Sequence, residues 1–182
     1  MDRIDKPIKV IEVELQRVAW QSLLLTVILS IALIALKGII HQDFGFSFSW
    51  FHFALFLLGY MILIVLHEVS HLLGFMIFAK VPWRSLEYGM NLKLGIAYAT
   101  TNELVQNKAM KRVLILPFWL TGVLPAIIGL VINHSLLVLL GAWLIAGAVG
   151  DFAMYKELRK LPNVTLIKDD PELPKLYVYK AN

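Results

Sequence analysis

The chain has 182 residues, of which 59% are hydrophobic and 16% are charged, against roughly 25% charged residues in an average soluble domain. This composition excludes an ordinary soluble protein and indicates an integral membrane protein. Cysteine is absent, which excludes disulfides, thiolate ligands and a cysteine nucleophile. The formal net charge of +4 comes without a basic patch interleaved with aromatic residues, so we expect no nucleic-acid partner.

The amino-terminal segment, residues 1–17, is polar and mixed in charge. Alternation over residues 11–16 fits a short strand, and helical spacing of the apolar residues fits nearly as well, so both interpretations stay open. The apolar run over residues 18–40 is too long for a signal-peptide core and lacks a cleavage site of small residues. We therefore expect it to be a retained transmembrane helix.

The second apolar run, residues 50–79, contains the sequence His67-Glu68-Val69-Ser70-His71. Positions i and i+4 of a helix share one face, so the two histidines can bind one metal ion. Glu68 lies beside them and can take a proton from a metal-bound water. The alternative is a pair of core histidines satisfied by neighbouring hydroxyls. Such groups are costly within hydrocarbon unless they are paired, protonated or bound to metal, which favours the metal site.

The composition changes over residues 83–112, which we expect to form a loop outside the membrane. Two short strands are indicated, over residues 85–91 and 93–99, with Asn and Gly at the bend. Thr100 to Glu103 resembles a capping box, and an amphipathic helix is expected to follow it.

The third apolar run, residues 113–132, contains Pro117, Gly122 and Pro125. Membrane helices tolerate such residues where neighbouring helices or a cavity satisfy the freed backbone groups. This span is therefore expected to line an opening that admits water.

A tight turn at Asn133 and His134 separates the third span from the fourth, which covers residues 135–155. The tail, residues 161–182, is polar and contains two possible strands, residues 164–168 and 176–180.

Together these elements predict one domain over residues 1–182. Its fold class is a membrane all-α core of about four transmembrane helices, with a small cytoplasmic β element and a short polar tail. Lysine and arginine number four in the amino-terminal segment, six in the 80–112 loop and six from Lys156 onward, whereas the opposite loops contribute only Lys37. The positive-inside rule then places both termini in the cytoplasm.

A catalytic zinc site usually has three protein ligands, and without cysteine these are nitrogen or oxygen atoms. Apart from Glu68, Asp151 is the only acidic residue near an apolar run. His67 and Asp151 lie nearly the same number of residues into spans that run in the same direction, so both are expected at one depth. The alternative is an interfacial charge paired with Lys156 or Arg159.

Small residues at four-residue spacing lead to Asp151 and would let helices pack closely there: Ala142, Ala146 and Gly150. The other histidines and loop glutamates are weaker candidates, because they lie at the opposite surface, too far along the helix, or in the cytoplasmic loop: His41, His52, His134, Glu87 and Glu103.

The His-Glu-x-x-His sequence in one span, with an aspartate late in another, resembles intramembrane zinc metalloproteases of the site-2 protease type. The chain is more similar, over about residues 50–180, to a family of small bacterial membrane proteins known as putative zincin peptidases. That likeness includes Gly150-Asp151 at the end of the last span and Asp170-Pro171 in the tail. Site-2 proteases carry their aspartate in a Leu-Asp-Gly setting, which is missing here, so the role of Asp151 depends on topology and depth.

The resemblance implies a Zn²⁺-dependent protease in the bacterial cytoplasmic membrane, surrounded by the lipid bilayer. Its substrate would be a membrane-anchored protein or peptide, and its oligomeric state stays open. The strands near residues 85–99 are expected to pair with an unwound substrate. Two alternatives are a non-proteolytic membrane protein that retains the metal site and a metal transporter. The shortage of polar residues in the outer half of the spans argues against transport.

Overall fold

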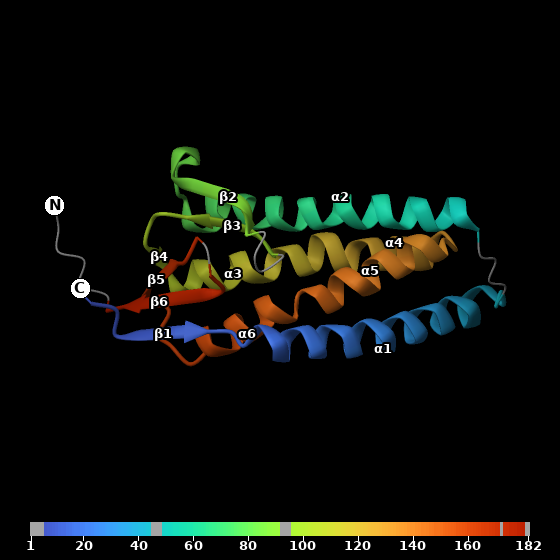
Figure 1. Cartoon of the computed structure of the whole chain (residues 1–182), viewed down its shortest axis with the longest axis horizontal. Coiled ribbons are helices and arrows are strands. Elements are labelled where there is room, and N and C mark those ends of the chain that lie inside the picture. The colour runs from blue at the N-terminus through green and yellow to red at the C-terminus, as the bar shows by residue number, and fades with distance from the viewer. Residues whose placement is uncertain (1–5, 45–48, 92–95, 172, 181–182) are drawn as a thin grey trace. The chain divides into compact units, whose positions relative to one another are not determined.

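A computed structural model describes residues 6–44, 49–91, 96–171 and 173–180 (Figure 1). Within these ranges, four helical runs are long and apolar enough to cross a membrane, as the composition predicts for a membrane protein. They are Leu15–His41, Trp50–Ala79, Asn107–Val131 and Ser135–Leu158. A mostly helical fold with four possible spans and a small sheet is therefore confirmed.

The first run is one regular α-helix, and each of the other three contains a departure from regular α-helix. The first run is α1 (Leu15–His41), and the second is α2 (Trp50–Gly74) followed by a π-helical turn, η1 (Phe75–Ala79). The third run joins α3 (Asn107–Pro117), a π-helical segment η3 (Phe118–Val123) and α4 (Leu124–Val131). The fourth run joins α5 (Ser135–Gly147) and α6 (Val149–Leu158) across a break at Ala148.

The chain divides into two compact units. The sheet unit consists of Met1–Leu15, Glu68–Leu116 and Gly150–Asn182, and the helical unit consists of Gln16–His67 and Pro117–Val149. The expectation of a single domain over residues 1–182 stays a prediction.

The sheet unit contains a four-stranded antiparallel sheet in the order β1-β6-β5-β4 (Figure 1). These strands are β1 (Lys9–Glu12), β4 (Val105–Gln106), β5 (Leu166–Asp169) and β6 (Lys175–Tyr179). The register pairs Ile11 with Leu176 and Ile167 with Val178. The strand interpretation of the amino-terminal segment is confirmed in part, because β1 overlaps the expected residues 11–16 only at Ile11 and Glu12 and α1 begins at Leu15. Both tail strands are confirmed within two residues of their expected ranges.

The core of the sheet unit forms where alternate residues of the strands meet apolar side chains of α3, α6 and the π-helical turn η1. Its largest fully buried side chains include Phe75, Met110, Leu158, Ile167 and Leu176. Asn107, at the first position of α3, ties these elements together because its Nδ2 donates to the carbonyls of Leu158, Leu161 and Pro162 at 2.9–3.0 Å.

A second, two-stranded sheet consists of β2 (Leu86–Asn91) and β3 (Ile96–Thr101), preceded by a short 3₁₀ turn, η2 (Trp83–Ser85). Leu86 pairs with Thr101 and Tyr88 with Ala99, which confirms the hairpin expected from the sequence. The bend expected at residues 92–95 lies outside the described residues.

The capping box expected at Thr100 and Glu103 is wrong. Thr101 ends β3, and its Oγ1 accepts from the Glu103 N–H and donates to the Ser85 carbonyl, so it fastens the hairpin instead of starting a helix. The helix begins at Asn107, after β4.

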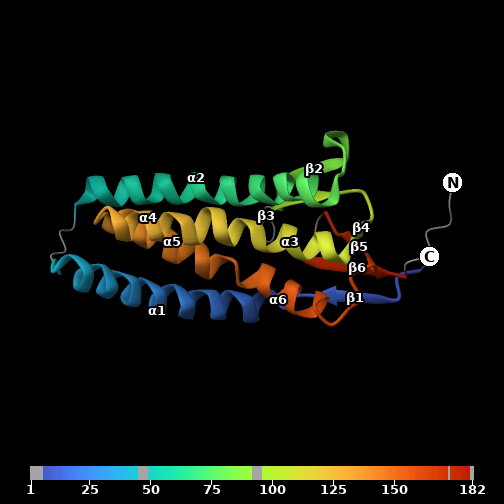
Figure 2. The same ribbon diagram turned by 180° about the vertical axis from the view of Figure 1, so that it is seen from behind.

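The helical unit is held together by close backbone contact between α4 and α5, which lie side by side in Figure 2. A Cβ added to Gly141 would lie 2.5 Å from the Ala126 backbone nitrogen, and one added to Gly129 would lie 2.6 Å from that of Val138. Small residues permit such approach in membranes, where packing replaces the hydrophobic effect between helices. Asn133, with φ 56°, makes the expected tight turn between the two helices.

Candidate metal centre

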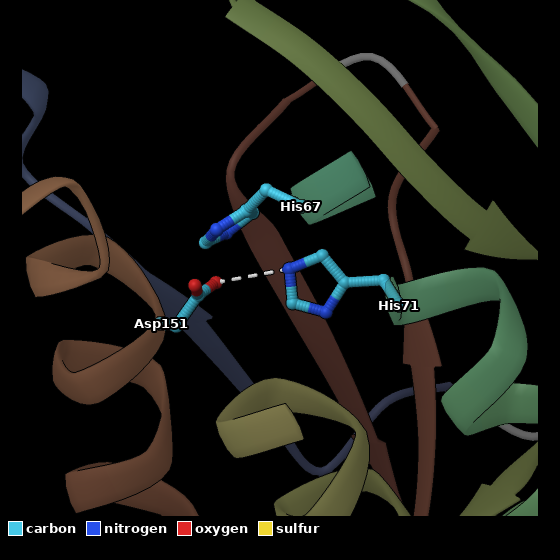
Figure 3. A group of neighbouring side chains, drawn as sticks. All are labelled: His67, His71 and Asp151. Atoms are coloured by element: carbon cyan, nitrogen blue, oxygen red, sulfur yellow. Dashed lines mark ion pairs between the residues drawn. The ribbon is translucent and has the colours of Figure 1, made fainter. Parts of the chain in front are cut away.

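Three side chains from two helical runs converge in the structure: His67 and His71 from α2 and Asp151 from α6 (Figure 3). Each offers one ligand atom, and these atoms lie within 4.8 Å of one another. The two histidines come from consecutive turns of one continuous helix, so the helix itself aligns them. The structure thus brings together the three residues that the sequence singled out as metal ligands.

His71 is only 7% exposed and uses both ring nitrogens. Its Nδ1 lies 3.2 Å from the Val113 carbonyl oxygen of α3. Its Nε2 lies 3.5 Å from Oδ1 of Asp151, along the dashed line in Figure 3. Two electron-rich atoms that face each other at this distance require a cation between them, either a proton on Nε2 or a metal ion.

The separation of Nε2 and Oδ1 fits zinc. With metal–ligand bonds of about 2.1 Å and tetrahedral angles, two zinc ligands lie about 3.4 Å apart. The observed 3.5 Å agrees with that spacing. The set of two imidazoles and one carboxylate is also a donor set of catalytic zinc sites, which leave one position open. The residues present therefore fit a zinc ion.

His67 is held by a hydroxyl group from the third helical run. Its Nδ1 lies 3.3 Å from Oγ1 of Thr121, and that hydroxyl donates to the Pro117 carbonyl at 2.8 Å. A neighbouring hydroxyl therefore does contact one histidine, as the alternative interpretation supposed. It occupies Nδ1 and leaves the second nitrogen of the ring for the metal group.

Asp151 lies in the first turn of α6, just after the break at Ala148. The positive end of the helix dipole favours a carboxylate at this position. Ala142 and Ala146, two of the small residues expected to let helices pack closely near Asp151, are fully buried. Asp151 takes part in an ion pair with His71, a partner that the interfacial alternative did not suppose.

Glu68 follows His67 on α2 and is partly exposed. It lies close enough to His71 for the two charges to interact. The structure thus has a carboxylate beside the two histidines that is not one of the three grouped side chains.

The other histidines have separate roles. His41 Nε2 contacts the Leu130 carbonyl at 2.6 Å, and His134 caps α5 by accepting from the Leu137 N–H. His52 is exposed and packs edge-on against Phe51. In the described part of the chain, His67, His71 and Asp151 are the group of side chains that could hold a metal ion.

Sequence reasoning missed three contributors near this group: the Val113 carbonyl, the Thr121 hydroxyl and Asp169. Thr121 lies one turn after Pro117, in a span that the sequence predicts to be irregular, and this position is a signal by which it could have been found. Asp169 ends β5, and burial raises its pKa to about 7, although Thr100 and His71 favour its ionised form. No sequence pattern indicates that this carboxyl group in a polar tail is partly buried.

A helix that carries His-Glu-x-x-His is the zinc-binding element of the metallopeptidases known as zincins. The sequence model of the family described as "Putative zincin peptidase" matches residues 60–166, and the chain belongs to this family. The matched range includes His67, Glu68, His71 and Asp151. The description of the family points to a zinc metallopeptidase. Neither the curated proteins nor the solved structures contain a match to this chain.

Proposed function

We propose that this protein is an intramembrane zinc metalloprotease that hydrolyses a peptide bond of a membrane-anchored protein or peptide. The observation that carries the proposal is the convergence of His67, His71 and Asp151 within helical runs apolar enough to cross a membrane. Family membership supports the peptidase chemistry, and the location of the ligands supports the membrane setting.

In this mechanism His67, His71 and Asp151 hold the metal. Zinc, when bound, supplies a Lewis acid that activates water near neutral pH and polarises the substrate carbonyl. Glu68 accepts the proton of the attacking water and returns it to the leaving amine. Asp151 neutralises part of the charge at the site, and Val113 and Thr121 orient the two imidazoles from behind.

Substrate binding is assigned to the β2–β3 hairpin, which belongs to the same unit as His71 and Asp151. Within the described residues, β2 pairs with β3 alone, so its other edge can accept an extended segment. Tyr88 and Met90 of β2 are 73% and 62% exposed and offer apolar contacts to such a segment. An unwound substrate presents the backbone that a protease needs, whereas an intact helix conceals it.

The proposed location is the bacterial cytoplasmic membrane, with both termini in the cytoplasm. The bias of lysine and arginine toward the loops on one side supports this orientation. Four helical runs that can each cross the membrane would return the chain to its starting side.

The test compares Glu68→Gln with the control Glu103→Gln, which changes an exposed glutamate between β3 and β4 in the same way. The purified proteins are assayed for zinc content and for cleavage of fluorescein-labelled β-casein and of a quenched single-span peptide in detergent. We expect Glu68→Gln to keep its zinc and to lose cleavage by about 10²- to 10⁴-fold, the usual contribution of a general base. Cleavage at the wild-type rate by Glu68→Gln would refute the mechanism.

A further inference from the structure

The third helical run departs from regular α-helix beside both histidines. Pro117 ends α3, and the π-helical segment η3 follows it. In an uninterrupted helix, the N–H of residue 117 would donate to the carbonyl of Val113, four residues earlier. Proline has no N–H, so the Val113 carbonyl lacks this donor. His71 Nδ1 lies 3.2 Å from that same oxygen.

This contact determines which nitrogen of His71 carries hydrogen. A carbonyl oxygen only accepts hydrogen bonds, so Nδ1 must be the donor. In the neutral ring Nε2 then carries a lone pair and no hydrogen, and Nε2 is the atom that faces Asp151 at 3.5 Å. The carbonyl freed by Pro117 thereby selects the tautomer of His71 that a metal ion requires.

The same proline acts on His67 through Thr121. The Thr121 hydroxyl has one hydrogen, and it donates this hydrogen to the Pro117 carbonyl at 2.8 Å. Toward His67 Nδ1, at 3.3 Å, the hydroxyl oxygen can therefore only accept. His67 must donate from Nδ1 as well, which leaves its Nε2 as the metal ligand.

A close approach of the helices makes the His71 contact possible. A Cβ added to Gly74, on the turn of α2 after His71, would lie 3.2 Å from Val113 Cα. This spacing is tighter than ordinary contact, so glycine allows the α3 backbone to lie close enough for the carbonyl to reach the imidazole.

We propose that Pro117 and Thr121 are positioning residues that fix both metal-binding histidines as the Nδ1–H tautomer, with each Nε2 directed to the metal. Val113, Pro117 and Thr121 recur every four residues and therefore share one side of the helical run. The inference rests on the metal site in the proposed function. It adds that Pro117 is required because it has no N–H to donate to the Val113 carbonyl, and not only because it interrupts the helix.

The test is made on the protein itself, without substrate. Zinc affinity is measured by competition with a chelator, and the tautomers of the zinc-free protein are read from ¹⁵N-histidine NMR at a pH where both rings are neutral. Thr121→Val keeps the shape and removes the hydroxyl, and Thr121→Ser restores it. The matched control is Thr26→Val in α1, which removes a hydroxyl that donates to the Ser22 carbonyl away from any histidine.

We expect Thr121→Val to lose the single tautomer at His67 and to bind zinc about 10- to 100-fold more weakly, as is typical when a partner of a metal ligand is removed. Thr121→Ser and Thr26→Val should match the wild type. Pro117→Ala reintroduces an N–H that competes for the Val113 carbonyl, and it should mix the tautomers of His71. If Pro117→Ala does not fold, the two Thr121 variants decide the question.

Unchanged tautomers and zinc affinity in Thr121→Val would overturn the proposal. Wild-type protein that binds zinc in the expected tautomers but cleaves no peptide would contradict the proposed function and leave this inference standing. Wild-type protein with both histidines protonated on Nε2 would refute the inference directly.

Discussion

The first and third helical runs have similar length and apolar character, but they differ in how much of each is buried and in how regular each helix is. In α1, only 11% of the most apolar window is buried and the helix is unbroken, whereas the third run buries 39% and contains Pro117, the segment η3 and Pro125. The third run also supplies the Val113 carbonyl and the Thr121 hydroxyl to the histidines. A regular apolar helix satisfies its own backbone, and an interrupted one has backbone groups available for chemistry.

The largest effect is expected from the substitution of His71. The comparison is with His41, because both histidines contact a carbonyl of the third run. His71→Ala removes a proposed ligand and should abolish stoichiometric zinc binding. His41→Ala, at the end of α1, removes only the contact with the Leu130 carbonyl and should leave zinc content unchanged. Metal analysis of both purified variants checks this prediction. Equal zinc content in the two variants would contradict the assignment of His71 as a metal ligand.

The next effect concerns the start of the third run. Asn107→Ala removes the two amide hydrogens that reach three carbonyls, whereas the Leu158 and Pro162 carbonyls keep backbone donors, so we expect a loss of about 2–3 kcal/mol. Ser22→Ala in α1 removes one donor, to the Ala146 carbonyl, and should cost about 1 kcal/mol. Unfolding in detergent measures both, and comparable losses would show that the first run is as important for stability as the third.

A smaller effect is expected where the third and fourth runs pack. Gly141→Ala would place its Cβ 2.5 Å from the Ala126 backbone nitrogen, and we expect it to destabilise the protein by about 1–3 kcal/mol. Gly147→Ala is the matched control, because its Cβ would meet nothing within 4 Å, and it should be neutral or slightly stabilising. Thermal unfolding midpoints of the two variants provide the comparison. A neutral Gly141→Ala would mean that α4 and α5 pack less closely than the structure has them.

The last prediction lies outside the helical runs, at Asp169, and concerns the dependence of stability on pH. Burial raises the pKa of this carboxyl from 3.8 to about 7, so the folded protein favours its protonated form. The resulting contribution to stability is complete below the unfolded pKa and is lost as the pH rises through about 7. Asp169→Asn should remove this part of the pH dependence and make the protein more stable than wild type at about pH 8. Unfolding midpoints between about pH 5 and pH 8 test the sign, and a less stable variant at the higher pH would contradict it.

The features that can be predicted from the sequence are of two kinds. They either repeat along the chain or are polar groups whose burial in hydrocarbon is energetically costly. Long apolar runs gave four helices, and polar groups within them drew attention to His67, His71 and Asp151. The depth of Asp151, close to that of His67, is predictable because every helical residue adds the same rise along the helix axis. The hairpin and tail strands followed from alternation and turn residues.

Contacts that depend on tertiary packing were not predictable in this way. The capping box at Thr100 failed because the pairing of β3 with β2 outweighed a local helix signal. The role of the Val113 carbonyl required knowing that Gly74 brings two helices together. The raised pKa of Asp169 is not predictable either, because it depends on the sheet pairing that leaves the end of β5 partly buried.

The order of the four-stranded sheet has a consequence for how the protein is made. β6 lies between β1 and β5, so the strand that joins the amino-terminal strand to the rest of the sheet is the last of the four to leave the ribosome. The pairing of Glu12 with Lys175 must wait until all four helical runs have been synthesised. A nascent chain can therefore insert its helices while the four-stranded sheet is still incomplete, and a peptidase built this way would finish maturing only after translation has passed β6.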